Sequence, residues 1–450
     1  MLKVIKDIWK IEYLFIVMMF GVFLGSKFLA IPMPFLTLNL GMILPIFMLY
    51  ASIKRLGWIK RIFLYTGPLF LLTIYASIQT FTLEEKALAV QDVRSLMMMS
   101  LTALTLLYSY EYFGKRIFFI LMSKVFWSLF VLLTVFGLFE YFTGIHIWAT
   151  GIETILSYTI SDFTFAPRFI WGNPNNFITA FLVVCAGIIL FDTRVAMNIF
   201  KQFLLLSILF FFSDTAQSKF GKIAALFMVA YIIYLNRALL IGKYRSNKKS
   251  LLIGFIFLLG VVINASWFLG PKFSSNRDYY LNEILVQNKT TGNLSYVNTD
   301  SLSIREKDSL IKRLKFARDK KRLGSTELRK NLIKNGAYYY GQEPVFGIGP
   351  GQYQLKNIKH QNKYEIETLQ GSHHFFVDIF SQYGILGILF ILFYIITVLV
   401  YLIGSKNWDQ KMAALISVSF LFFGSNLPSK FSTFECAYIA LALIPFLSYN

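Results

Sequence analysis

Residues 373–403 read HHFFVDIFSQYGILGILFILFYIITVLVYLI, a run that begins with two histidines and continues as one long apolar segment. A helix needs about 20 predominantly apolar residues to cross the hydrocarbon core of a bilayer, and this run is longer than that. The segment therefore predicts a membrane-spanning helix with a polar, histidine-bearing start. Apolar runs of similar length recur along the chain, so the same interpretation extends to the whole protein.

The composition supports this class. The chain has 450 residues, of which 56% are hydrophobic and 15% are charged, and its mean hydropathy is +0.57. A soluble protein carries roughly 25% charged residues. We predict an all-α polytopic membrane protein with about 12 transmembrane helices and one large extracytoplasmic loop. The predicted spans are 11–30, 36–53, 62–82, 93–110, 117–142, 174–191, 202–213, 220–240, 250–269, 375–403, 412–424 and 431–448.

Three regions follow from these spans. Residues 1–269 hold transmembrane helices 1–9, residues 270–374 form the large loop, and residues 375–450 hold helices 10–12. The loop is expected to be partly helical, because Gly324 interrupts one helical pattern and Ser325–Glu327 opens another.

The net charge of +20 follows the ordinary pattern of a membrane protein rather than that of a nucleic-acid-binding one. Basic residues gather in alternate short loops, which places these loops in the cytoplasm. We expect a multi-pass protein of the cytoplasmic (inner) membrane, with both termini cytoplasmic and loop 270–374 outside. The two cysteines, Cys185 and Cys436, lie in apolar spans, so no disulfide framework or CxxC metal site is expected.

The polar residues of interest lie on the predicted outer face. Arg168 precedes Gly172-Asn173-Pro174-Asn175 at the start of one span, and Lys219 lies at the start of another. Pro174 is ordinary at a helix start, whereas an arginine beside that start favours an anion site. Taken alone, Lys219 is more typical of an interfacial anchor than of a ligand.

The large loop ends in a second set of such residues. Arg329 is followed by the glycine series Gly347, Gly349 and Gly351, and then by His373-His374. No Lys-Ser/Thr follows the glycines, so the series is not a nucleotide-binding P-loop. A tight turn that lets the backbone approach a sugar or phosphate is the better interpretation.

Taken together, these segments resemble the O-antigen ligase/polymerase family of bacterial membrane proteins. The family's arginine and Asn-Pro-Asn element resembles Arg168 with residues 172–175, and its Ser-Arg-Gly turn is similar to residues 218–221, where Lys219 replaces the arginine. Its Pro-x-x-Gly-x-Gly-x-Gly run resembles residues 344–351. Its His-Asn and Glu-x-Gly-x-x-Gly elements are similar to residues 373–387, where His374 replaces the asparagine.

The resemblance implies a GT-C-like glycosyltransferase. Such an enzyme moves a glycan from undecaprenyl pyrophosphate to an acceptor sugar hydroxyl on the outer face of the membrane. His373 is implied as the general base, although His374 is an alternative. The residues implied to bind pyrophosphate are Arg168, Arg329 and Lys219, and those implied to support binding are Asn175, Gly349, Gly351 and His374. No metal and no cofactor are expected.

The leading functional hypothesis is a polymerase that joins lipid-linked repeat units of a surface polysaccharide such as capsule or O-antigen. The basic outer loop, with 18 basic and 10 acidic residues over 271–372, favours this hypothesis because it suits a polyanionic chain. A ligase that transfers finished polysaccharide is the nearest alternative, and a transporter of lipid-linked sugar is the alternative of another class. The expected partners are the lipid-linked donor and acceptor, membrane lipids, a flippase and a chain-length regulator.

Overall fold

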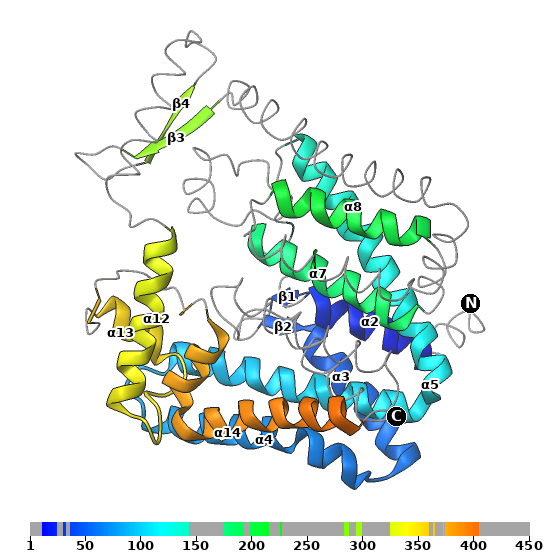
Figure 1. Ribbon diagram of the computed structural model, residues 1–450, viewed down its shortest axis with the longest axis horizontal. Coiled ribbons are helices and arrows are strands. Elements are labelled where there is room, and N and C mark those ends of the chain that lie inside the picture. Colours follow the sequence, from blue (N-terminus) through cyan, green and yellow to red (C-terminus); the bar gives the residue numbers. More distant parts are fainter. Residues whose placement is uncertain are drawn as a thin grey trace. The chain divides into compact units, whose positions relative to one another are not determined.

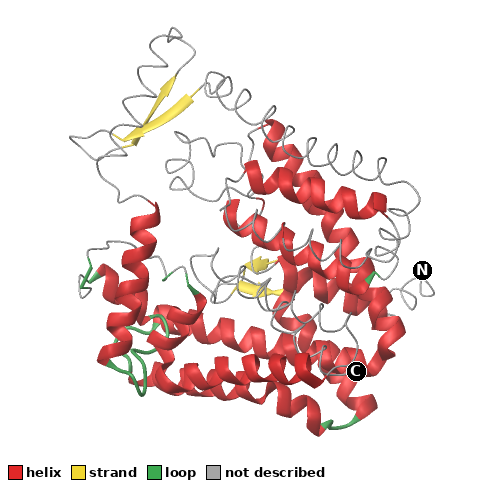
Figure 2. Cartoon of the chain, in the orientation of Figure 1, coloured by secondary structure: helices red, strands yellow, loops and turns green. Residues whose placement is uncertain are grey.

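The computed structural model describes a set of segments that are mainly helical (Figures 1 and 2). The described residues are 11–24, 30–32, 37–143, 167, 169, 174–192, 199–215, 226, 283–287, 294–298, 325–359, 363–364, 372 and 374–404. Of the predicted site, Arg168, Lys219 and His373 lie outside these residues. The spans predicted at 250–269, 412–424 and 431–448 lie outside them as well.

The helices follow the predicted apolar runs closely. Their bounds are α2 Ile11–Leu24, α3 Leu40–Leu56, α4 Lys60–Thr82, α5 Ala87–Thr143, α7 Pro174–Phe191, α8 Ile199–Thr215, α12 Ser325–Gln342, α13 Gln352–Ile358 and α14 Phe375–Gly404. Two short antiparallel hairpins pair β1 Ala30–Pro32 with β2 Thr37–Asn39, and β3 Glu283–Gln287 with β4 Leu294–Asn298. The apolar periodicity does not predict these hairpins.

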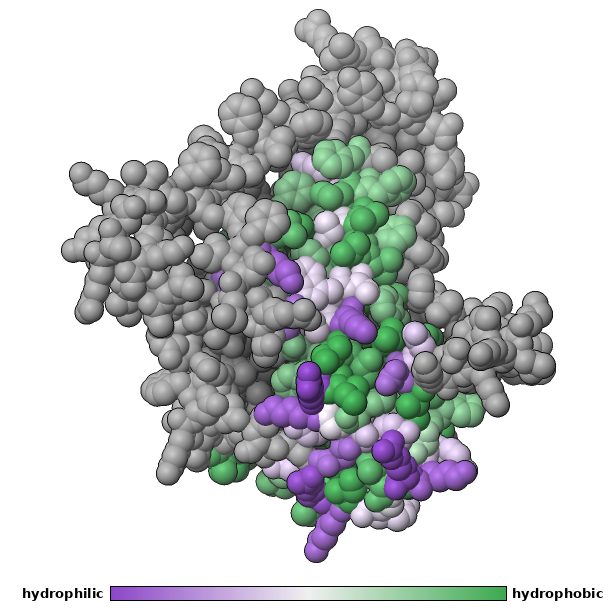
Figure 3. Space-filling model, turned by 90° about the vertical axis from the view of Figure 1, so that its right-hand side faces the viewer, coloured by the Kyte–Doolittle hydropathy of each residue, from purple (hydrophilic) through white to green (hydrophobic). Residues whose placement is uncertain are grey.

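Three of the described helices are long and apolar enough to cross a membrane: α4, α5 and α14. The prediction of a helical membrane protein is therefore confirmed at this level. The count of about 12 helices, the orientation of the termini and the three-region division stay predictions. On the face shown in Figure 3, hydrophobic side chains cover much of the described surface and hydrophilic ones gather toward its lower edge.

Helix α5 combines two of the predicted spans. Its backbone leaves the helical region at Gly114, where φ is 73° and ψ is 157°. This break falls between the spans predicted at 93–110 and 117–142, beside the basic pair Lys115-Arg116. The two halves of α5 therefore correspond to two separate predicted spans.

The chain divides into two compact units, one of residues 1–130, 182–195 and 327–450, and one of residues 131–181 and 196–326. In the second unit, Phe177 and Phe212 pack edge to face with ring centroids 5.2 Å apart. A Cβ at Gly137 would lie 2.7 Å from the Phe212 ring, so this glycine allows the close packing. The first unit contains the residues of the candidate site.

Within the first unit, α4 and α14 lie side by side and antiparallel (Figure 1). The Tyr394 hydroxyl donates to the carbonyl of Tyr65 at 3.5 Å. Ten residues further along α4, the Tyr75 hydroxyl bonds to the segment that lies against Ile385 of α14. The C-terminal end of α4 and the start of α14 are consequently at the same end of the pair.

Candidate active site

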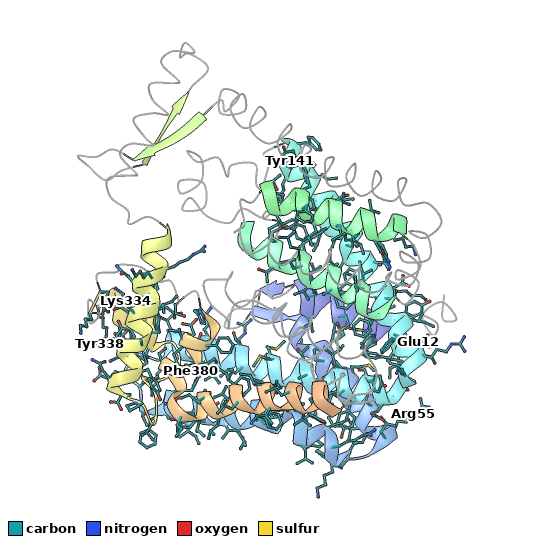
Figure 4. The ribbon with its side chains drawn as sticks, viewed as in Figure 1. Glu12, Arg55, Tyr141, Lys334, Tyr338 and Phe380 are labelled. Atoms are coloured by element: carbon teal, nitrogen blue, oxygen red, sulfur yellow. The ribbon has the colours of Figure 1, made fainter. Side chains whose placement is uncertain are left out.

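The broken start of α14 forms one side of the candidate site. This helix leaves helical geometry at Gly384, with φ 56° and ψ −137°, so residues 375–383 form a short segment ahead of the longer apolar part. His374 caps this segment, because its carbonyl accepts from the amide of Asp378 at 3.0 Å. Figure 4 labels Phe380 in the short segment and Lys334 and Tyr338 on α12, at the same end of the unit.

A local network fixes the backbone around His374. The Ser372 hydroxyl donates to the His374 carbonyl at 2.7 Å and accepts from the His374 amide at 3.0 Å. The Ser372 amide donates to Asp378 Oδ1 at 3.0 Å, and Asp378 is only 6% exposed. A side chain of the first helical turn thus reaches back to satisfy an amide ahead of the helix, as in a capping box.

The imidazole of His374 takes no part in the hydrogen bonds of this cap. Its ring centroid lies 5.7 Å from that of Phe376. The Nδ1 atom is buried and has no hydrogen-bond partner in the described part of the chain. Burial lowers the pKa of His374, which favours the neutral, proton-accepting imidazole at neutral pH.

Helix α12 packs directly against the first turn of α14. A Cβ added to Gly336 would lie 2.1 Å from Val377 Cγ1, so only glycine allows this approach. Arg329, Leu332 and Gly336 share one face of α12, because their spacings of three and seven residues match the helical repeat. Arg329 therefore lies on the α14-facing side, roughly 10 Å along the helix from the Gly336 contact.

Arg329 is half-buried, and burial lowers the pKa of its guanidinium. Among the described residues, no carboxylate forms an ion pair with it, and no nearby charge contributes to the change in its pKa. A partly desolvated cation without an acidic partner is a suitable binding group for an anionic ligand.

A small core lies between α12 and α13. It contains the buried residues Leu332, Tyr339, Ile348 and Tyr353. The Tyr353 hydroxyl donates to the Leu332 carbonyl at 2.5 Å, and the Tyr339 hydroxyl donates to Asn357 Oδ1 at 2.9 Å. Burial raises the pKa of Tyr353, and the nearby Asp378 carboxylate raises it further. This core holds α12 in a fixed position beside α14.

The glycine series forms a tight turn that we call the glycine turn, residues 344–351. Gly347, Gly349 and Gly351 have φ values of 73°, 94° and 70°, which a glycine adopts at little cost. The turn packs on the break in α14, because a Cβ at Gly347 would lie 2.3 Å from the Gln382 carbonyl oxygen. The predicted tight turn is confirmed. The close approach that the structure shows is to the protein's own backbone.

Two buried side chains from other helices complete this contact. The amide of Gly351 donates to Asp92 Oδ2 at 2.9 Å and to Gln382 Oε1 at 2.6 Å. Asp92 belongs to the second turn of α5 and is 2% exposed. Sequence analysis missed Asp92, and the one available signal was a carboxylate close to the start of a long apolar helix.

The structure brings four of the predicted residues into one unit: Arg329, Gly349, Gly351 and His374. Asn175 lies in the first turn of α7, and the predicted helix start at Pro174 is confirmed. The predicted roles of all eight residues, including Arg168, Lys219 and His373, stay predictions. Among the described residues there is no group of three or more His, Cys, Asp or Glu side chains that would hold a metal ion.

A comparison with protein families matches residues 202–392 to the model described as O-antigen ligase. The resemblance found in the sequence is thereby confirmed. The matched segment contains Lys219, Arg329, the glycine turn, both histidines and the broken start of α14, whereas Arg168 and Asn175 precede it. No curated protein matches the chain.

The match supports a ligase- or polymerase-type glycosyl-transfer activity, and the long apolar helices support a location in a membrane. The family match does not separate the two activities, and it does not specify the donor.

Proposed function

We propose that this protein is a polymerase of bacterial surface polysaccharide. It joins repeat units carried on undecaprenyl pyrophosphate, and it does so at the outer face of the cytoplasmic membrane. The alternative within the same chemistry is a ligase that moves finished polysaccharide to a different acceptor.

The observation that carries the proposal is the packing of the helix that bears Arg329 on the first turn of α14. Arg329 is a half-buried cation without an acidic partner among the described residues. Its helix packs on the first turn of α14 through Gly336 and Val377, directly after the histidine pair. A half-buried cation suits the binding of a diphosphate group. An imidazole suits the removal of the proton from an acceptor hydroxyl.

The reaction balances without a cofactor. The bond between the anomeric carbon of the donor glycan and the diphosphate oxygen breaks, and the electron pair leaves with undecaprenyl pyrophosphate. The acceptor oxygen bonds to the same carbon, and its proton passes to an imidazole. We assign the proton to His373. His374, whose neutral form is favoured by burial, is the neighbouring candidate.

Arg329 stabilises the negative charge that develops on the diphosphate, and its planar guanidinium suits bidentate contact with phosphate oxygens. Arg168 and Lys219 are proposed to contribute further positive charge. Lys219 offers a point charge rather than a fork, so its contribution is expected to be the weaker one. Gly349, Gly351 and Asn175 are proposed to support the bound substrate.

The polymerase and the ligase differ only in the acceptor, which suggests the test. Purified protein is reconstituted and supplied with lipid-linked repeat units alone. The polymerase proposal predicts a ladder of products that differ by one repeat unit. Product that appears only after a different acceptor is added would instead identify a ligase, and the His373→Ala variant controls for background hydrolysis.

A further inference from the structure

The tip of the glycine turn exposes two apolar side chains. Val345 is 53% exposed and Phe346 is 65% exposed, whereas the residues that follow them, Gly347 to Pro350, are buried. These side chains are adjacent in the chain, and a contiguous exposed apolar patch is typical of a surface that contacts a membrane or another protein.

Hydrogen bonds place this tip beside two candidate membrane-spanning helices. The Phe346 carbonyl accepts from the Tyr75 hydroxyl and from Gln79 Nε2, both at 2.6 Å. Tyr75 and Gln79 lie seven and three residues before the end of α4 at Thr82, or roughly 10 Å and 5 Å along its axis. The tip therefore lies alongside the last two turns of α4 rather than beyond its end.

The backbone of the turn is suited to a site with little water. Each backbone amide from Gly347 to Gly351 donates to an acceptor in the protein, except at Pro350, which has no amide hydrogen. Ile348 and Gly349 donate to the carbonyls of Ser381 and Gln382, at 2.9 and 3.0 Å. Irregular backbone is tolerated at membrane depth only where such groups are satisfied by protein.

The exposed tip continues the apolar surfaces of both helices. The Ile385 amide donates to the Val345 carbonyl at 3.1 Å, which places Val345 at the first residue after the break in α14. Ile385 is 49% exposed and Leu389, one turn further, is 54% exposed. On α4, Ile78 is 59% exposed. These are the surfaces that a bilayer would cover.

We propose that the glycine turn is a lipid-inserted element. Val345 and Phe346 insert among acyl chains at the membrane boundary next to the C-terminal end of α4. The turn thereby fixes the depth of the connected groups, including Gln382 and the break in α14, at the headgroup level. This proposal depends on membrane insertion alone and stands independently of the glycosyl-transfer proposal.

The test measures the depth of a spin label in the full-length protein. Cys185 and Cys436 are replaced by alanine, and a nitroxide is attached to Phe346→Cys in vesicles of phosphatidylethanolamine and phosphatidylglycerol. Leu71→Cys, in the middle of α4 and 69% exposed, gives the lipid reference. Lys334→Cys, exposed on α12 and labelled in Figure 4, gives the water reference. Oxygen reports lipid access, and a water-soluble nickel chelate reports water access.

The expected result is that collisions with oxygen exceed collisions with the nickel chelate at position 346, as at position 71, with the reverse order at position 334. A label at 346 that behaves like the one at 334 would overturn the proposal. A label that is shielded from both reagents would overturn it too, because protein would then cover the tip. A second label at Val345→Cys must give the same order, and since all the labelled side chains are exposed, folding should be preserved.

Discussion

Among the described helices, α5 and α14 are each broken at a glycine with positive φ, and the surroundings of the two breaks differ. At Gly114 in α5, φ is 73°, and a Cβ would meet nothing within 4 Å. At Gly384 in α14, φ is 56°, and a Cβ would lie 2.4 Å from the Val345 carbonyl oxygen. The first break only redirects the chain between two spans. The second receives another segment of chain.

The difference extends to chemistry. The helical segment ahead of Gly384 begins after His374 and carries the buried carboxylate Asp378. The glycine turn that packs on the break is held by the side chains of Asp92 and Gln382. Around Gly114 lie the basic residues Lys115 and Arg116, whose side chains are exposed. The break at Gly384 thus differs from the break at Gly114 in receiving the glycine turn, which comes from another part of the chain.

The largest expected effect separates the chemistry of the two breaks. We predict that His373→Ala lowers the rate of glycan extension by about 10²- to 10⁴-fold, the usual contribution of a general base. Lys115→Ala, beside the other break, should change the rate by no more than about twofold, since it alters only a surface charge. The measurement is product length and yield with lipid-linked repeat units, after membrane insertion has been verified.

His374→Ala is the matched comparison for that variant. If His374→Ala abolishes extension while His373→Ala retains it, the base is His374 and our assignment of the pair is reversed. Normal extension by both variants would remove the general-base role from this end of α14.

The second prediction compares the two glycines directly. Gly114→Ala should lower the free energy of unfolding by about 1–2 kcal/mol, because a residue with a Cβ is strained at a positive φ. Gly384→Ala adds overlap with the backbone of Val345 and Gly347, so we expect about 2–5 kcal/mol in all. Unfolding midpoints in detergent would report both, and equal losses would show that the two breaks are equivalent.

A third, smaller effect tests Arg329, the half-buried cation of α12. Arg329→Ala should reduce the rate by about 10- to 100-fold, because a hydrogen bond to a charged group contributes roughly 1.5–3 kcal/mol. Arg329→Lys should retain part of the rate, because the positive charge remains but the bidentate hydrogen bonding of the guanidinium is lost. The neighbouring Lys330→Ala, an exposed residue on another face of α12, should behave like wild type. Equal rates for all of these variants would exclude Arg329 from the site.

The smallest expected effect is a pH dependence of stability. Burial lowers the pKa of His374 in the folded protein, so the unfolded chain takes up a proton more readily near pH 6.5. The unfolding midpoint should therefore stay level above about pH 7, and this residue should lower it as the pH falls below about 6.5. The unfolding midpoint of His374→Gln should therefore fall less steeply at acid pH. If it falls as steeply as that of wild type, His374 does not contribute to the pH dependence of stability.

Much of the fold was predictable because apolar length and turn chemistry act locally. The span predicted at 174–191 matches α7, Pro174 begins that helix, and Ser325 begins α12. The two spans on either side of Lys115-Arg116 appear as the two halves of α5. The β1–β2 and β3–β4 hairpins were not predictable, since they are short and lack a clear alternation of apolar and polar residues.

The site was predictable in its residue types and only partly in its contacts. The glycines of residues 347–351 indicate positive φ values from sequence alone. Their packing partner does not follow from sequence, because the carbonyls of Ser381 and Gln382 become available only where Gly384 breaks α14. Asp92 was missed for the same reason: its partner Gly351 lies 259 residues away in the chain.

The central claim is that positive charge on α12 and an imidazole at the start of α14 act together on a lipid diphosphate. The most direct measurement is the rate at which purified wild type, Arg329→Ala and His373→Ala release undecaprenyl pyrophosphate and form glycosidic bonds, with Lys330→Ala as control. We predict one molecule of lipid released per bond by wild type and by Lys330→Ala, and strongly reduced release by the other two. Wild-type release by both Arg329→Ala and His373→Ala would contradict the account.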